Sequence, residues 1–78
     1  MTTFHLRVYV GPTLVGSMAR EFRASGLTVT VEGTAHVHVS LETDADPREA
    51  LIAQLRATWG HAFCLTAHDV QVVRREAR

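Results

Sequence analysis

Three histidines, one arginine and one tyrosine stand at alternate positions of two short segments: His5, Arg7, Tyr9, His36 and His38. On an extended chain, residues two apart point to the same side, about 6–7 Å from each other. His36 and His38 could therefore share a metal ion, with His5 as a third ligand. Zinc takes three or four protein ligands, and no carboxylate or thiol clearly converges on this pair. We expect the five residues to bind a partner, with no metal and no cofactor.

The segments that carry these residues, 4–10 and 35–42, alternate without a break. The intervening positions are apolar: Phe4, Leu6, Val8, Val10, Val37, Val39 and Leu41. This alternation predicts two β-strands, each with one buried face and one polar face. If the strands are neighbours, the polar face also includes Ser40, and an edge strand would extend it by Thr28 and Thr30.

Two amphipathic helices are predicted between the strands. The first follows the turn signal Gly11-Pro12 and begins near Pro12 or Thr13. Its buried stripe is expected to be Leu14, Met18 and Phe22. Gly16 inside this helix lowers its propensity and suggests close packing there, and Ser25-Gly26 ends it.

The second helix has a well-defined start. Asp46 suits the N-cap, Pro47 the first helical position and Glu49 the third. Its apolar stripe is Leu51, Leu55 and Trp59, and Gly60 ends it.

The remaining segments complete the order of elements. Residues 27–32 alternate as a strand, and Gly33-Thr34 connects them to segment 35–42 as a hairpin. Alternation at Phe63, Leu65 and Ala67 predicts an extended stretch, and a final strand is expected at about Asp69 to Arg74. We expect residues 74–78 to fray.

The predicted order is strand, helix, strand, strand, helix, strand, in one domain over residues 1–78. In its topology the chain resembles the ferredoxin-like fold, a split βαβ arrangement of the α+β class. The resemblance implies a four-stranded antiparallel sheet with the first and third strands at its centre. It also implies two helices on one face of that sheet, so that the polar face stays open.

Composition narrows the class of protein. The formal net charge is zero, so no charge excess attracts the chain to nucleic acid or to an anionic membrane. All basic residues are arginine, and neither lysine nor asparagine occurs. This bias indicates a GC-rich genome, such as that of an actinobacterium or one of its phages. We expect a cytoplasmic protein with no signal peptide or membrane span, because Cys64 is a single cysteine and no apolar run is long enough.

Catalytic motifs are incomplete. The stretch from Gly11 to Ser17 is similar to a phosphate-binding loop but has serine at the position of the essential lysine. Acylphosphatases share the expected topology, but their catalysis needs an asparagine, which this chain lacks. Nothing in the sequence orients Cys64 and His68 as nucleophile and base. We therefore expect no enzymatic activity.

The sequence favours a small interaction or regulatory module that uses its polar sheet face to form a homodimer or to bind another protein. Tyrosine and arginine are favoured in such interfaces. The alternative is single-stranded nucleic acid on the same face. RNA-recognition motifs share the topology, and Tyr9 and Arg7 suit base stacking and phosphate contact. The chain lacks their RNP1 pattern and the basic stripe typical of such proteins.

Overall fold

The computed structural model describes residues 1–59 and 69–77 of the 78-residue chain. Its elements, in chain order, are β1 (Thr2–Tyr9), α1 (Val15–Ala24), β2 (Thr28–Glu32), β3 (His36–Thr43), α2 (Pro47–Trp59) and β4 (Val70–Ala77). The structure is thus a small α+β domain, and the predicted order of strands and helices is confirmed.

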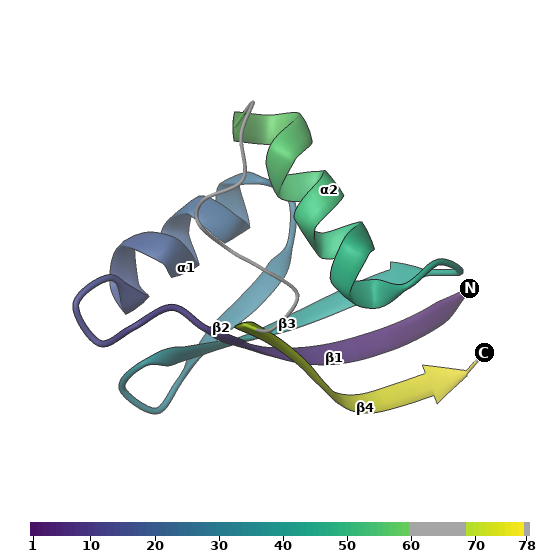
Figure 1. The fold of residues 1–78 in the computed structure, drawn as a ribbon, viewed down its shortest axis with the longest axis horizontal. Coiled ribbons are helices and arrows are strands. Elements are labelled where there is room, and N and C mark those ends of the chain that lie inside the picture. Colours follow the sequence, from purple (N-terminus) through teal and green to yellow (C-terminus); the bar gives the residue numbers. More distant parts are fainter. Residues whose placement is uncertain (60–68, 78) are drawn as a thin grey trace.

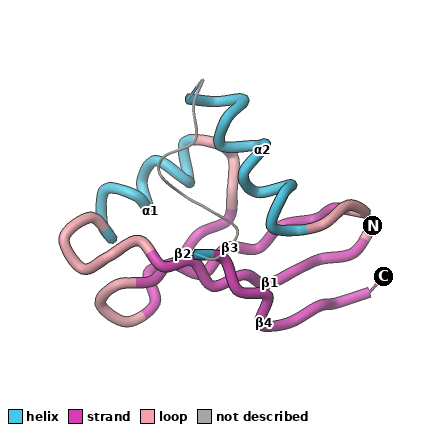
Figure 2. Tube along the Cα trace, viewed as in Figure 1, coloured by secondary structure: helices cyan, strands magenta, loops and turns pink. Residues whose placement is uncertain are grey.

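The four strands form one antiparallel sheet in the order β2-β3-β1-β4. The first and third strands are neighbours at its centre. Both helices lie on the same side of the sheet (Figure 1), so that the molecule has a helix layer above a strand layer (Figure 2). We call the sheet face turned away from the helices the open face. The chain termini lie close together, because Thr2 of β1 pairs with Ala77 of β4.

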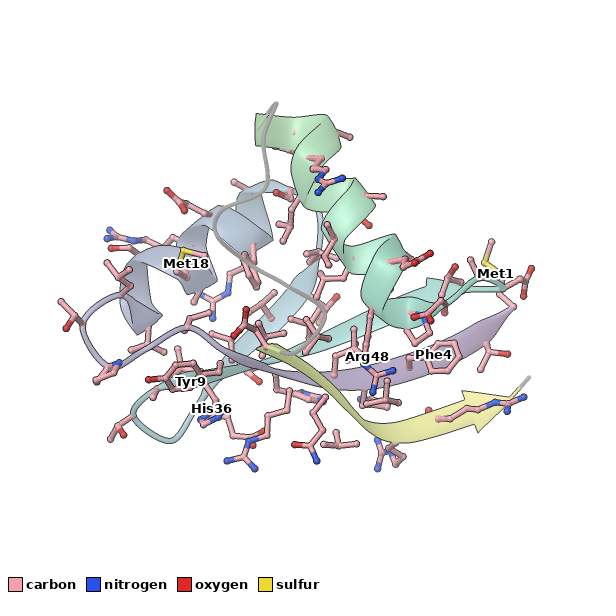
Figure 3. All side chains as sticks on the ribbon, viewed as in Figure 1. Met1, Phe4, Tyr9, Met18, His36 and Arg48 are labelled. Carbon is pink, nitrogen blue, oxygen red and sulfur yellow. The ribbon has the colours of Figure 1, made fainter. Side chains whose placement is uncertain are left out.

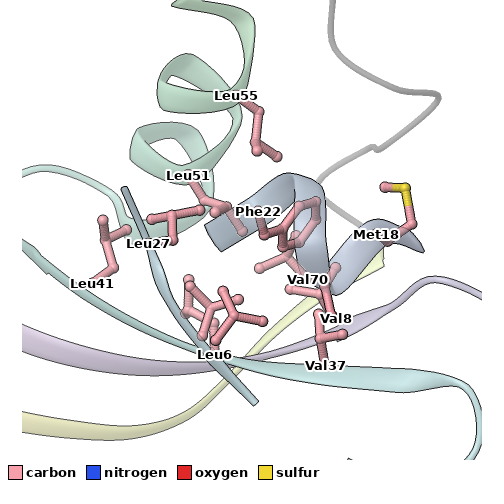
Figure 4. Close-up of a cluster of buried hydrophobic side chains, with 13 residues drawn as sticks. Leu6, Val8, Met18, Phe22, Leu27, Val37, Leu41, Leu51, Leu55 and Val70 are labelled. Carbon is pink, nitrogen blue, oxygen red and sulfur yellow. The ribbon is translucent and has the colours of Figure 1, made fainter. Parts of the chain in front are cut away.

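The core lies between the sheet and the helices (Figure 4). Its largest fully buried side chains come from both helices and from the two central strands. They are Phe22 of α1, Leu51 and Leu55 of α2, and Leu6, Val8, Val37 and Val39 of β1 and β3. Leu6 pairs with Val39, and Val8 pairs with Val37, across β1 and β3. Burying each such side chain contributes about 1.5–3 kcal/mol, so these alternate positions hold the two layers together.

Three predicted helix and turn signals are confirmed in atomic detail. The carboxylate Oδ1 of Asp46 accepts a hydrogen bond of 2.9 Å from the backbone N–H of Arg48, which caps α2. Gly26 follows α1 with φ of +90°, the left-handed conformation expected after a helix end. Gly33 has φ of +65° in the hairpin between β2 and β3.

The start of α1 differs from its prediction. The helix begins at Val15, two to three residues later than expected, and Leu14 is its N-cap. Leu14 is 54% exposed and lies outside the buried stripe that Met18 and Phe22 do form. Gly16 is exposed, and a Cβ atom built on it would meet nothing within 4 Å. The inference of close packing at Gly16 was therefore wrong.

The last strand is longer than predicted. β4 runs to Ala77 and pairs with β1 along its length, so the expectation of a frayed end from residue 74 onward was wrong for residues 74–77. Pairing with the central strand β1 gives hydrogen-bond partners to the backbone groups on one side of this segment. The predicted extended stretch from Phe63 to Ala67 lies outside the described residues.

Candidate functional site

The open face carries all five residues singled out in the sequence. Arg7 lies opposite His38, Tyr9 opposite His36, and His5 opposite Ser40 in the register of β1 and β3. The residues between them are the buried valines and leucines of the core, so strict alternation assigns these side chains to the open face. The structure divides the five into three local groups rather than one cluster.

The first group is a pair of imidazoles. His5 Nδ1 and His38 Nε2 are 3.1 Å apart, within hydrogen-bonding distance. The two rings are parallel, at an interplanar angle of 3°, but their centroids are 5.1 Å apart. Because the nitrogens are much closer than the centroids, the rings meet at their edges rather than face to face. Only 13% of the His5 side chain is exposed, so this ring is nearly covered although it lies on the open face.

The second group is Tyr9 with His36. Their ring centroids are 5.3 Å apart at an angle of 66°, an edge-to-face contact (Figure 3). Such contacts are worth about 0.5–1.5 kcal/mol beyond the area they bury. Tyr9 is nevertheless 50% exposed. A large amphipathic ring held in place by a neighbour is suited to contact another surface.

The third group is Arg7 with Glu32 of β2. Arg7 Nε lies 3.1 Å from Glu32 Oε1, and both side chains are nearly half exposed. The Nε atom itself is shielded from solvent and has no hydrogen-bond partner of suitable geometry. The contact is therefore an ion pair rather than a directed hydrogen bond.

β4 adds residues that the sequence analysis did not assign to this face. Val72 pairs with Leu6, but Arg74 pairs with His5, so a β-bulge at Val73 inserts one extra residue. Without the bulge, Arg74 and Glu76 would share the parity of the core residues Val70 and Val72. With it they reach the open face, where Arg74 Nη2 lies 2.8 Å from Glu76 Oε1. Alternation alone places Arg74 and Glu76 with Val70 and Val72, so the sequence carries no signal that assigns them to the open face.

A shallow depression of about 390 Å³ crosses the open face. All four strands contribute to its lining, which includes His5, Thr30, Glu32, His38, Val73 and Arg74. The histidine pair lies at its centre, on the two middle strands. Val73 at the β4 edge is 49% exposed. The depression is wide open to solvent, so its shape suits a broad contact rather than an enclosed small molecule.

The histidine pair is poorly arranged for a metal ion. His5 contacts His38 through Nδ1 and Glu76 through Nε2, at 3.1 and 3.2 Å. These two nitrogens lie on different edges of one ring and cannot bind the same ion. Among residues 1–59 and 69–77, no group of three His, Cys, Asp or Glu side chains is placed to hold a metal. Cys64 and His68, the candidate nucleophile and base, lie outside the described residues.

No protein-family model, curated protein or solved structure matches this chain. Within the described ranges, neither helix is long and apolar enough to cross a bilayer. The function must therefore be inferred from the open face itself.

Proposed function

We propose that this chain is a small, non-catalytic interaction module that associates with a second copy of itself through the open face. The observation that carries the proposal is the internal pairing of charge on that face. Arg7 pairs with Glu32, and Arg74 pairs with Glu76. Both arginines thus have carboxylate partners in the face itself, which favours a neutral protein surface as the partner over a polyanion.

A second copy fits this charge pattern. A two-fold dimer brings the same patch of each protomer together, so the patch must be complementary to itself. Each of the two Arg–Glu pairs is neutral and adds no excess of like charge when the face is duplicated, and the further carboxylate of this face, Glu42, contacts Thr3 near the end of β3. Tyr9 and Val73, each about half exposed, supply the apolar contact area.

The area of the open face limits how strong the proposed dimer can be. Strands about 4.8 Å apart and about 3.4 Å per residue give this sheet a projected area of about 400–500 Å². Accessible surface exceeds projected area, because it follows the relief of the side chains. A stable interface buries about 800 Å² per partner, and weak ones bury less. We therefore expect an interface at the small end of this range and a weak dimer.

We also propose that the domain has the ferredoxin-like fold. The order β2-β3-β1-β4 and the helices on one side are compatible with the ferredoxin-like class. Small domains of that class commonly pair through an open sheet or an edge strand. A reducing cytoplasm is the proposed compartment, because a single cysteine forms no intramolecular disulfide.

Sedimentation equilibrium over a concentration series tests the dimer. We expect self-association that Val73→Asp abolishes, because the substitution puts a charge into the contact, and that Tyr9→Ala weakens. Leu14→Asp is the matched control: Leu14 is 54% exposed but belongs to the helix layer, so this variant should dimerise like the parent. Circular dichroism checks that all three variants remain folded.

A protein that stays monomeric up to millimolar concentration would overturn the proposal, as would equal effects of Val73→Asp and Leu14→Asp. The alternative partner is single-stranded nucleic acid. Salt-sensitive binding of short oligonucleotides by a monomer, lost in Tyr9→Ala, would favour that alternative.

A further inference from the structure

His5 has two candidate partners at each ring nitrogen. On one edge, Nδ1 lies 3.1 Å from His38 Nε2 and 3.4 Å from the hydroxyl of Ser40. On the other edge, Nε2 lies 3.0 Å from Arg74 Nη2 and 3.2 Å from Glu76 Oε1. The ring thus connects the centre of the sheet, at β3, to its edge strand, β4.

The two partners of Nε2 exclude each other. A guanidinium only donates hydrogen bonds, and an ionised carboxylate only accepts them. Arg74 can therefore bond Nε2 only where that nitrogen has its lone pair, and Glu76 only where it carries a proton. The position of one proton on His5 decides which side chain of β4 it holds.

The choice at Nε2 is coupled to His38 through the ring. A neutral imidazole carries one N–H. If that N–H is at Nδ1, it donates to His38 Nε2, and Nε2 accepts from Arg74. We assign this arrangement to the neutral pair, because the Arg74 contact is the shorter of the two at Nε2.

One added proton changes the arrangement. The His5–His38 hydrogen bond uses a single proton between Nδ1 and Nε2, so the outer nitrogens of a singly charged pair must both carry protons. His5 Nε2 then faces Glu76 as a donor, and Arg74 loses its acceptor on the ring. A second proton would place N–H against N–H across 3.1 Å, so the rings would have to separate.

We propose that His5 and His38 form a proton-operated switch on the open face. The first proton changes the hydrogen-bond partner of His5 Nε2 from Arg74 to Glu76, and the second proton separates the two rings. The effect of the switch on association rests on the proposed function: if the open face forms the dimer, acid weakens self-association through the switch. Two protons on each face add positive charge to both protomers at the same place, which is repulsive across a two-fold interface.

The charged groups around the pair set the direction of this effect. Glu76 of β4 is the carboxylate in hydrogen-bonding distance of His5, and it balances the first proton. Arg7, next to His5 on the same face of β1, and Arg74 of β4 oppose further charge. On β2, Glu32 is engaged with Arg7, and Thr30 lies opposite His38. On β3, His36 contacts Tyr9, and Glu42 lies two residues beyond Ser40, the residue opposite His5.

Nitrogen NMR of the imidazole rings from pH 8 to pH 5 tests the switch, because histidines titrate in this range. At pH 8 we expect the proton of His5 on Nδ1 and a lone pair on Nε2. On acidification, the signals of His5 and His38 should change together in two steps, because the hydrogen bond between the two rings holds a single proton. Independent single-step curves for His5 and His38, or a proton on His5 Nε2 at pH 8, would overturn the switch.

Two variants test whether Glu76 stabilises the first added proton. Glu76→Gln removes the balancing charge and should move the first step to lower pH. The matched control is Glu42→Gln, which alters another carboxylate of the open face, one that contacts Thr3, and should move that step less. Equal displacement of the step in both variants would contradict the assigned role of Glu76.

Sedimentation at pH 7.5 and pH 5 tests the link to association. We expect weaker self-association at pH 5 and loss of this difference in His38→Gln. If the protein is monomeric at both values but shows the two-step curve, the proposed function is wrong and the switch stands. If it dimerises but the histidines titrate independently, the switch is wrong and the proposed function stands.

Discussion

The two faces of the central strands are built from neighbouring residues but are organised by different forces. On β3, Val37 and Val39 are fully buried beneath the helices, while His36 and His38, which alternate with them, lie on the open face. Burial of the valines is non-directional and depends on area. The histidines instead make directed contacts with His5 and Tyr9. Substitutions on the face covered by the helices, which we call the covered face, should therefore lower the unfolding free energy more than comparable substitutions on the open face.

The largest expected effect is the difference in unfolding free energy between truncating a buried leucine and truncating an exposed one. Leu51 of α2 is fully buried, and Leu51→Ala should cost about 2–5 kcal/mol of unfolding free energy, since it leaves a cavity in the core. Leu14→Ala deletes the same atoms at a position that is 54% exposed and should cost less than about 0.5 kcal/mol. Urea unfolding of both variants measures the difference. Similar losses would mean that Leu14 packs more than its exposure indicates.

An isosteric exchange compares the two faces directly. Val39→Thr places a hydroxyl in the covered face without a partner and should cost about 1–3 kcal/mol. Thr30→Val makes the reverse change on the open face, where Thr30 is exposed opposite His38, and should alter stability by less than about 0.5 kcal/mol. Thermal and urea unfolding give both values. Equal costs would show that the open face is packed like a core.

The covered face could be predicted from the sequence because it depends on periodicity alone. Alternation in residues 4–10 and 35–42 identified the core residues of β1 and β3, and capping chemistry identified the start of α2 at Asp46. At the start of α1, periodicity alone misplaced Leu14. A position one turn before Met18 is buried only if the helix has begun there, and the turn at residues 12–14 delays that start.

The open face was predicted in part. Its two central strands were assigned from alternation, but Arg74 and Glu76 were missed because the bulge at Val73 reverses the parity of β4. A bulge depends on pairing with another strand and has no local signature in this sequence. The hydrogen bond between His5 and His38 could not be predicted from the sequence either, since it runs diagonally between strands and depends on their register.

The smallest expected effect concerns the ion pair of Arg7 and Glu32. Exposed pairs couple by about 0.2–1 kcal/mol in double-mutant cycles. Both partners here are nearly half exposed, so we expect the lower part of that range. Arg7→Met, Glu32→Gln and the double variant, each unfolded in urea, give the coupling energy. At 1 M salt, where charges are screened beyond about 3 Å, the coupling should fall further.

A coupling well above 1 kcal/mol that survives 1 M salt would contradict the contrast between the two faces. It would mean that the shielded Nε of Arg7 makes this pair part of the folded core, because the energy of a desolvated pair depends little on salt. A small, salt-sensitive coupling would instead leave Arg7 and Glu32 as a surface pair that neutralises the open face. Neutralisation without much stabilisation is what an interface between two copies requires, since such a pair can rearrange on contact without unfolding either protomer.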